Sequence, residues 1–241
     1  MILKLVKQRV EASNEKDLLQ MILEGAKSSA DYNDLSHNKF IVDNCKTLFF
    51  AGHETIASTA SWSFMLLAAH PDWQARVHDE IVHSKIHKEM RALPSCIFVQ
   101  LKMVIQEVLR LCAPAVFVTR EALETVTLKN IVIPKGVQLQ IQVPFLHQNP
   151  DLWGPNAHKF NPERFANGIM AACQSPQAYM PFGNGPRISV GRHWAMTELK
   201  VMLALILSKF SFSLSPTYRH SPVYTMVVEP EHGIIPHATR V

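Results

Sequence analysis

A glycine-rich loop that leads into an apolar helix is the feature that most constrains the fold of this chain. Within residues 181–191 an aromatic residue and three glycines surround an arginine, and a serine precedes the last glycine: Phe182, Gly183, Gly185, Arg187, Ser189 and Gly191. Glycine permits backbone conformations and close approaches that other residues do not. We expect an apolar helix over 193–207 to follow this loop.

Composition narrows the class of protein. The chain has 241 residues, of which 47% are hydrophobic, enough for a buried core in one large domain or two small ones. The formal net charge is +4 and the basic residues are dispersed, so no nucleic acid partner is expected. The four cysteines show no zinc-site or disulfide-framework spacing, and reduced intracellular thiols are expected. Most of the twelve histidines are expected on the surface.

Periodicity predicts a mainly α fold with a small, irregular β portion. Helices are expected over 4–27, 40–70, 71–86, 101–111 and 193–207, and a polar loop over 28–38. The leucine and isoleucine stripe of the first helix comprises Leu18, Leu19, Ile22 and Leu23. Strands are expected within 115–144, with a hairpin bent at Pro134-Lys135-Gly136, and again from Phe210 to the end. Residues 149–177 are rich in proline and are expected to form an irregular meander.

Two charged residues on the helix over 101–111 are candidates for a buried pair. Glu107 and Arg110 are three residues apart, which places them on one face of a helix. Taken alone, this spacing favours a solvated helix face, where such a pair contributes little to stability.

Taken together, these segments resemble the cytochrome P450 family. The loop matches the family's Phe-Gly-x-Gly-x-Arg-x-Cys-x-Gly signature, with Ser189 in place of the cysteine, and Glu107 and Arg110 match its Glu-x-x-Arg element. Pro162-Glu163-Arg164-Phe165 matches a further element, whose arginine joins that pair in a structural triad. The resemblance extends from about Glu15 onward and corresponds to the C-terminal half of a family member. It implies the C-terminal half of the cytochrome P450 fold, treated as a single region over 1–241.

The resemblance implies an oxygen-activation groove in the helix over 40–70. Within Ala51-Gly52-His53-Glu54-Thr55, the helix is expected to open, Thr55 to hydrogen-bond dioxygen and Glu54 to help deliver protons. The alternative is a local helix irregularity with a solvated Glu54, since a mid-helix glycine and threonine are poor choices for stability.

The resemblance also implies a site for haem b. Phe182 would shield the axial ligand, Gly183 and Gly191 would allow close backbone approach, and Arg187 would bind a propionate. Arg120 matches a second propionate-binding arginine, and the alternative for it is a surface strand residue.

Ser189 occupies the position of the axial ligand and changes its chemistry. In the family a cysteine thiolate pushes electron density onto the iron. A thiol ionises near a pKa of about 8.5 and an alcohol, like water, near about 15.7, a gap of about 10 kcal/mol in deprotonation cost. Serine is therefore expected to be a weak ligand. His193 and Cys173 are the substitute donors considered; His193 would need the loop to move, and Cys173 has no positional match.

Three functions stay open. The first is a haem-dependent monooxygenase that takes electrons from a flavoprotein reductase and hydroxylates a small apolar substrate. The second is a non-catalytic remnant or interaction module, favoured by Ser189 and by the absence of the family's N-terminal half, with its membrane anchor and most of its substrate pocket. The third is a serine-ligated haem protein with altered, peroxide-dependent chemistry. Without the anchor, a cytoplasmic or peripheral membrane location is expected, in place of the family's endoplasmic reticulum membrane.

The C-terminal tail suggests a group within the family. Its Phe210–Pro216 and Tyr218–Pro222 segments resemble the plant clan that modifies gibberellins and related terpenoid hormones.

Overall fold

The computed structural model describes residues 1–11, 17–28, 34–84, 98–234 and 236–241. It divides the chain into two compact units, Met1–Glu54 and Thr55–Val241, and the boundary between them falls inside the 36-residue helix α3 (Asp34–Ala69). The first unit contains α1 (Ile2–Glu11), α2 (Leu18–Ser28) and the beginning of α3. The expectation of one helix over 4–27 is wrong, because the structure has two helices there and Asp17 belongs to neither; residues 12–16 and Cys96 lie outside the described residues.

A small apolar cluster holds the first unit together. Its buried members are Val6, Leu23, Ala26 and Ile41. Leu19 and Ile22 pack against this cluster, as the apolar stripe predicts, whereas Leu18 is 44% exposed. The expectation of a loop up to residue 38 is wrong at its end, because α3 is already helical from Asp34.

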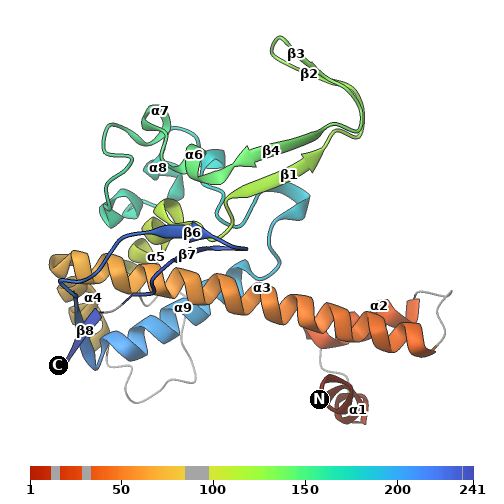
Figure 1. Ribbon diagram of the computed structural model, residues 1–241, viewed down its shortest axis with the longest axis horizontal. Helices are drawn as coiled ribbons and strands as arrows, with labels where there is room; N and C mark the ends of the chain where they lie inside the picture. Colours follow the sequence, from red (N-terminus) through yellow and green to blue (C-terminus); the bar gives the residue numbers. More distant parts are fainter. Residues whose placement is uncertain (12–16, 29–33, 85–97, 235) are drawn as a thin grey trace. The chain divides into compact units, whose positions relative to one another are not determined.

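The second unit is built around four helices whose side chains form its main core. These are the remainder of α3, α4 (Pro71–His83), α5 (Val99–Leu111) and α9 (Arg192–Leu207) (Figure 1). Pro71 lies at the first position of α4, where the missing N–H of proline costs no helical hydrogen bond. Trp62, Leu101, Ile105 and Leu203 are among the fully buried residues of this core. The mainly helical class with a small β portion is confirmed.

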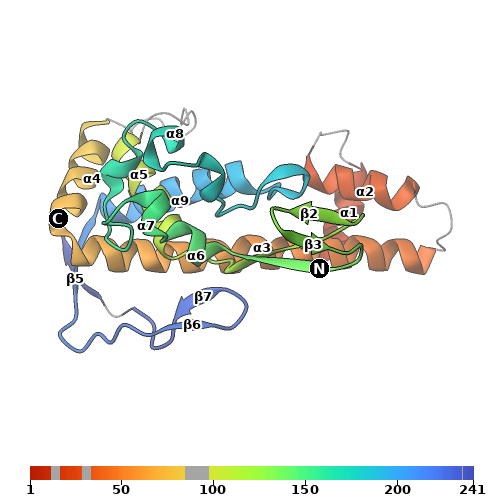
Figure 2. The same ribbon diagram turned by 90° about the horizontal axis from the view of Figure 1, so that it is seen from above.

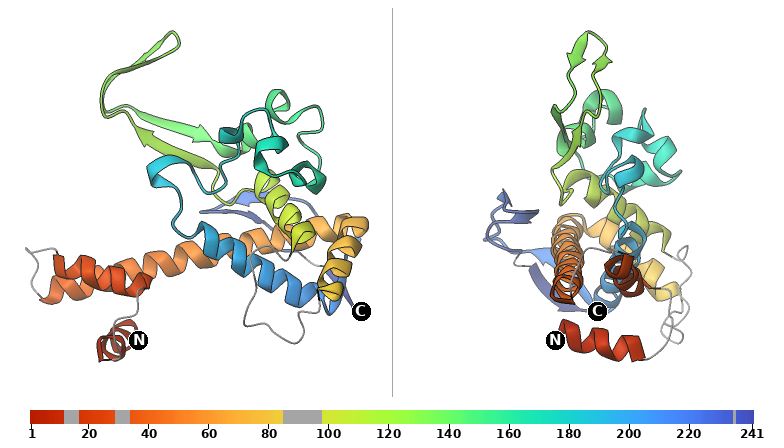
Figure 3. Two further views of the ribbon diagram at one scale, coloured as in Figure 1. Left: turned by 180° about the vertical axis from the view of Figure 1, so that it is seen from behind. Right: turned by 90° about the vertical axis from the view of Figure 1, so that its right-hand side faces the viewer.

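Two antiparallel strand pairs follow α5. β1 (Phe117–Glu121) pairs with β4 (Gln138–Gln142), and β2 (Val126–Leu128) pairs with β3 (Ile131–Ile133). The β2–β3 hairpin lies at the far end of the β1–β4 ribbon (Figure 3). The expected hairpin bent at Pro134–Gly136 is therefore wrong in its pairing. The bend of β2–β3 contains Lys129, with φ of 53°, and the Pro134–Gly136 turn passes the chain from β3 to β4.

The meander consists of short helical turns without a common axis. They are α7 (Pro150–Trp153), the 3-10 turn η2 (Pro162–Phe165), α8 (Ile169–Ala172) and η3 (Pro176–Ala178), and the short helix α6 (Val143–His147) precedes them. Trp153 and Phe165 insert into the main core from this segment. The meander thereby covers α5.

Short strands close the second unit. β5 (Phe210–Leu214) pairs with β8 (Pro236–Arg240), and β6 (Pro222–Tyr224) pairs with β7 (Val228–Pro230). Ser58 Oγ and Trp62 Nε1 of α3 both donate to the carbonyl of Val228, at 2.5 and 2.9 Å. These bonds join the β6–β7 hairpin to α3, and α9 lies on the opposite side of this part of α3 (Figure 2). Among the helices that the structure describes, none is both long and apolar enough to cross a bilayer.

Candidate functional site

Glu107 and Arg110 form a fully buried, two-pronged ion pair on α5. Arg110 Nε donates to Glu107 Oε2 and Arg110 Nη2 to Oε1, each at 2.7 Å, and both side chains have 0% exposure. Parallel hydrogen bonds of this kind suit the planar guanidinium. The remaining Arg110 donors reach the backbone carbonyls of His147, Ala157 and Lys159. Arg110 therefore ties three points of the chain after the β region to α5.

Arg164 of η2 lies close to the same carboxylate, but its hydrogen bonds go to backbone carbonyls. Its Nε lies 3.8 Å from Glu107 Oε1, an ion-pair distance without a hydrogen bond, and that oxygen accepts the Asn161 N–H at 2.9 Å. The Arg164 Nη atoms donate to the carbonyls of Trp153 and Asn156, at 2.7 and 3.1 Å. Burial lowers the pKa of the Arg164 guanidinium, and the charge of Glu107 opposes this. The structure thus unites the three residues of the expected triad, with unequal bonding.

The glycine-rich loop makes tight turns before α9. Gly183 and Gly185 have φ of 75° and 76°, a region that residues with a Cβ rarely adopt. Backbone bonds from Gly183 N to Met180 O (3.0 Å) and from Ser189 N to Phe182 O (2.9 Å) fold the loop on itself. Gly191 has φ of −81°, so its backbone does not require glycine. Phe182 is half-buried against the main core.

The two candidate propionate-binding arginines differ in their surroundings. Arg187 is exposed in the 3-10 turn η4 (Gly185–Arg187). Arg120 of β1 lies against the loop, because its Nη2 donates to the carbonyl of Asn184 at 2.9 Å. The structure therefore brings Arg120 and the loop together.

The side chain at the ligand position is an exposed hydroxyl. Ser189 is exposed and precedes the start of α9 by three residues. A neutral hydroxyl does not supply the thiolate that the sequence resemblance implies, so the donor at this position does not fit a thiolate-ligated haem.

The substitute donors are engaged elsewhere. His193 Nε2 accepts from Arg192 Nε at 3.1 Å, and the Cys173 thiol is buried and donates to Ser175 O at 3.0 Å. Burial raises the pKa of the Cys45, Cys112 and Cys173 thiols, to about 12 for Cys112. Within the described residues there is no cluster of three histidine, cysteine or acidic side chains that could hold a metal ion. No described thiol therefore takes the place of the missing cysteine.

The expected groove in α3 is continuous α-helix. The residues from Ala51 to Thr55 are all helical, so the expected opening of the helix is not observed. A Cβ added to Gly52 would meet no atom within 4 Å. Glu54 ends the first compact unit and Thr55 begins the second, and the roles of both stay predictions.

His147 is the residue that sequence reasoning missed. It ends α6, is 0% exposed, and contacts both α5 and the segment before the glycine-rich loop. Most histidines were expected on the surface, and no local motif marks this one. Neighbouring apolar residues of the sequence, Val143 to Leu146, are the one signal that indicates burial.

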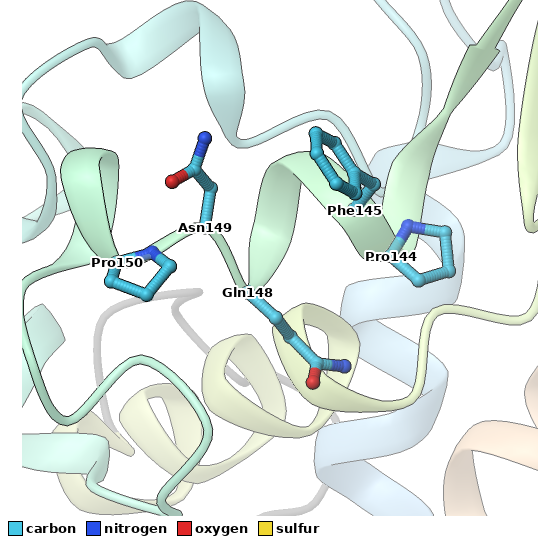
Figure 4. A pocket seen from close by; sticks show the side chains of 5 residues that line it. All are labelled: Pro144, Phe145, Gln148, Asn149 and Pro150. Atoms are coloured by element: carbon cyan, nitrogen blue, oxygen red, sulfur yellow. The ribbon is translucent and has the colours of Figure 1, made fainter.

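An open hollow lies on the surface between α6 and α7. It is lined by Pro144, Phe145, Gln148, Asn149 and Pro150 (Figure 4). Phe145 is 69% exposed there, and Gln148 Nε2 donates to Leu111 O at 3.2 Å. The hollow contains none of the residues expected at the haem site.

Comparisons with known proteins find relatives that match most of this chain. The chain matches the family model described as "Cytochrome P450" over residues 1–236. It is 48% identical over 228 residues to cytochrome P450 714A2 of Arabidopsis thaliana, covering 92% of this chain and 43% of that protein. It is 38% identical over 228 residues to 11-oxo-beta-amyrin 30-oxidase of Glycyrrhiza uralensis, with 92% and 43% coverage. The chain thus spans less than half the length of these relatives.

A solved structure shows the same architecture. The structure titled "Retinoic acid bound cyanobacterial CYP120A1" matches with a TM-score of 0.82 at 29% identity. The match covers 100% of this chain and 55% of that one. The described fold therefore corresponds to about half of that structure.

Proposed function

This chain belongs to the cytochrome P450 family of haem monooxygenases, and we propose that Ser189 impairs the family's oxygen chemistry in it. The observation that carries the proposal is the exposed hydroxyl at the ligand position, in a loop whose other signature residues are present. The buried Glu107–Arg110 pair and the approach of Arg164 support a family-like scaffold around that loop. The residues that support the loop therefore match the family, whereas the residue at the axial-ligand position does not.

The proposal favours a chain with little or no monooxygenase activity over an active enzyme. Removing a proton from an alcohol costs about 10 kcal/mol more than removing one from a thiol, by the difference in their ordinary pKa values. A non-catalytic binding or interaction role is the second candidate, favoured by this same substitution. If haem binds, Arg120, Arg187 and Phe182 are the residues proposed to surround it.

The experiment is a carbon monoxide difference spectrum of the reduced protein, with and without Ser189→Cys. We expect no thiolate-type band from the unchanged chain after supply of haem, and gain of that band in Ser189→Cys. Ser213→Cys, an exposed serine of β5, controls for the mere addition of a thiol. A thiolate-type band from the unchanged chain would overturn the proposal. No haem absorbance from any variant would favour the non-catalytic role.

The substrate class is proposed from the relatives. One relative's name mentions 11-oxo-beta-amyrin, and the solved structure's title mentions retinoic acid. Both molecules are extended, apolar and built from isoprene units. We infer that the whole protein to which this fold corresponds would bind a terpenoid, with gibberellin-like diterpenoids as the narrower class. Equilibrium binding of labelled diterpenoid and triterpenoid acids, compared with an unbranched fatty acid, tests this inference.

The electron donor is likewise proposed. A flavoprotein reductase would reduce a variant that holds haem through a thiolate, so Ser189→Cys is the variant in which to measure reductase-dependent reduction. Equal reduction of the unchanged chain would contradict the proposed impairment.

A further inference from the structure

His147 joins α5 to the segment that leads into the glycine-rich loop. Its Nε2 lies 3.0 Å from Met180 N, and its Nδ1 lies 3.1 Å from Arg110 O. Since Met180 N–H can only donate, Nε2 must be unprotonated, and Nδ1 must carry the proton that is donated to Arg110 O. The two contacts therefore select one neutral tautomer. Arg110 Nη1 donates in return to His147 O at 2.7 Å.

The surroundings hold the imidazole in place. Tyr179 stacks on it, with ring centroids 5.5 Å apart and planes at 25°, and Trp153 meets it edge-on at 6.3 Å. Tyr179 Oη in turn donates to Gln106 O of α5 at 3.0 Å. Met180 is buried in a second cluster with Ala113 and Val143. The ring is thus enclosed on several sides and bonded at both nitrogens.

The contacts continue from the imidazole into the loop. Met180 donates its N–H to His147 and accepts the Gly183 N–H at its carbonyl, 3.0 Å away. Gly183 is the first glycine of the loop and has a positive φ. A series of hydrogen bonds therefore runs from the arginine of the buried ion pair through His147 and Met180 to the first turn of the loop.

We propose that His147 is a positioning residue, whose neutral imidazole fixes the entrance of the glycine-rich loop relative to the buried Glu107–Arg110 pair. The loop carries the position of the axial ligand, so its placement decides where that side chain points. The proposal concerns the polypeptide and holds with either serine or cysteine at residue 189.

The same geometry makes the loop entrance sensitive to acid. Among the described residues, Arg110 of α5 carries the charge that acts on the ring; it is paired with Glu107, and the neighbouring phenol is that of Tyr179. Burial, together with the charge of Arg110, lowers the pKa of His147 to about 4, against the opposing effect of hydrogen bonds to the backbone of Arg110 and Leu109. A protonated ring cannot accept from Met180 N–H and places a second cation beside Arg110. Acidification therefore releases Met180.

Three substitutions separate the two nitrogens of the ring. In His147→Gln, the side-chain carbonyl oxygen can take the place of Nε2 as the acceptor. In His147→Asn, the side-chain amide can take the place of Nδ1 as the donor. His147→Phe keeps a ring but can form neither hydrogen bond. The measurement is amide hydrogen exchange of Met180 and Gly183 in the full chain, with Val77 of α4 as the reference amide.

We expect His147→Asn and His147→Phe to speed exchange at Met180 about tenfold, the effect of losing one hydrogen bond, while His147→Gln stays near the unchanged chain. Val77 should exchange alike in all of them. Equal exchange at Met180 in the Asn and Gln variants would overturn the proposal. So would an equal rise at Val77, since that would reveal general destabilisation.

The acid arm of the experiment compares the unchanged chain with His147→Gln between about pH 6.5 and pH 4. After correction for intrinsic exchange, the protection of the Met180 amide should decrease with falling pH in the unchanged chain and stay constant in His147→Gln. His158→Gln, which alters an exposed histidine of the same unit, should behave as the unchanged chain does. A fall of the same size in His147→Gln would contradict the inference. No haem is needed, so this result is separate from that of the carbon monoxide experiment.

Discussion

Among single residues, Arg110 and Arg164 approach one carboxylate but differ in what depends on them. Arg110 makes both short bonds to Glu107 and also satisfies backbone carbonyls in α6 and the meander. Arg164 stands 3.8 Å from Glu107 and its side chain is 10% exposed. The carboxylate is therefore neutralised mainly by Arg110, and Arg164 mainly holds two turns of the meander.

This difference predicts a ranking of two matched substitutions. Arg110→Met should reduce the free energy of unfolding by about 3–5 kcal/mol, because it leaves a buried charge without its close partner. Arg164→Met should cost about 1–3 kcal/mol, because it removes bonds to carbonyls and leaves the Glu107–Arg110 pair intact. Urea unfolding followed by tryptophan fluorescence measures both. Equal losses would show that the three side chains act as an evenly shared triad.

The sequence predicted some of the contacts of the site and missed others. Three-residue spacing placed Glu107 and Arg110 on one helix face, and the motif around Arg164 indicated its approach. Burial of the pair and the bonding of Arg164 to carbonyls depend on the path of the meander, which no local pattern specifies. His147 was missed for the same reason, because its partners lie 37 and 33 residues away.

Among the elements, α5 begins without a cap from its own sequence. Its N-cap residue Phe98 makes no side-chain cap bond, and the first helical N–H groups need acceptors. Glu80 of α4 supplies them: its Oε1 accepts from Val99 N and Gln100 N at 2.7 and 2.8 Å, and its Oε2 accepts from Leu101 N at 3.0 Å. A carboxylate at the positive end of a helix is also favoured by the helix dipole.

The cap predicts a cost for Glu80→Ala. Three N–H groups of α5 would lose their acceptor, and we expect the free energy of unfolding to fall by about 1–2 kcal/mol, as for other lost caps. Asp79→Ala removes an exposed acid of the same helix that makes none of these bonds, and should change stability by less than about 0.5 kcal/mol. Urea midpoints of the two variants provide the comparison. An equal midpoint for both would mean that water replaces the Glu80 carboxylate at no cost.

Element boundaries followed the local pattern better than element pairing did. The apolar period located α5 and α9 to within two residues of their observed bounds. Strand pairing failed because Pro134-Lys135-Gly136 has the composition of a hairpin turn, while the chain uses it to reach β4. The observed pairing is extended by Ala122, whose carbonyl accepts the Gly136 N–H at 2.8 Å and whose N–H donates to Val137 O at 3.0 Å. These bonds join residues fourteen and fifteen positions apart in the sequence, which the residues of the turn alone do not predict.

On the scale of the whole molecule, stability of the second unit should depend on pH through His147. The native pKa is about 4 against an ordinary value of 6.5, so between these values the unfolded chain binds a proton that the folded chain does not. Unfolding free energy must then rise with pH through this window and level off above about 6.5. Burial of a neutral ring is therefore favourable near neutral pH and becomes a cost in acid.

The size of the effect follows from the shift. At about 1.4 kcal/mol for each unit of pKa, His147 alone should remove about 1.4 kcal/mol on acidification to about pH 5.5 and about 2.5 kcal/mol at about pH 4.5. His147→Gln lacks this group, so the difference between its pH profile and that of the unchanged chain isolates the contribution. All four tryptophans, Trp62, Trp73, Trp153 and Trp194, belong to the unit Thr55–Val241, so urea unfolding followed by their fluorescence reports on that unit.

The direction of that difference is the decisive point. Carboxylates that are bonded in the folded state also lose stabilising interactions in acid, but they do so in both proteins and cancel in the comparison. The remaining difference in the free energy of unfolding between the two proteins should decrease as the pH falls below about 6.5. A difference that does not change with pH would mean that His147 keeps its ordinary pKa in the folded chain and that water reaches the ring. The enclosed contact between Arg110, His147 and Met180 would then have to be open in solution.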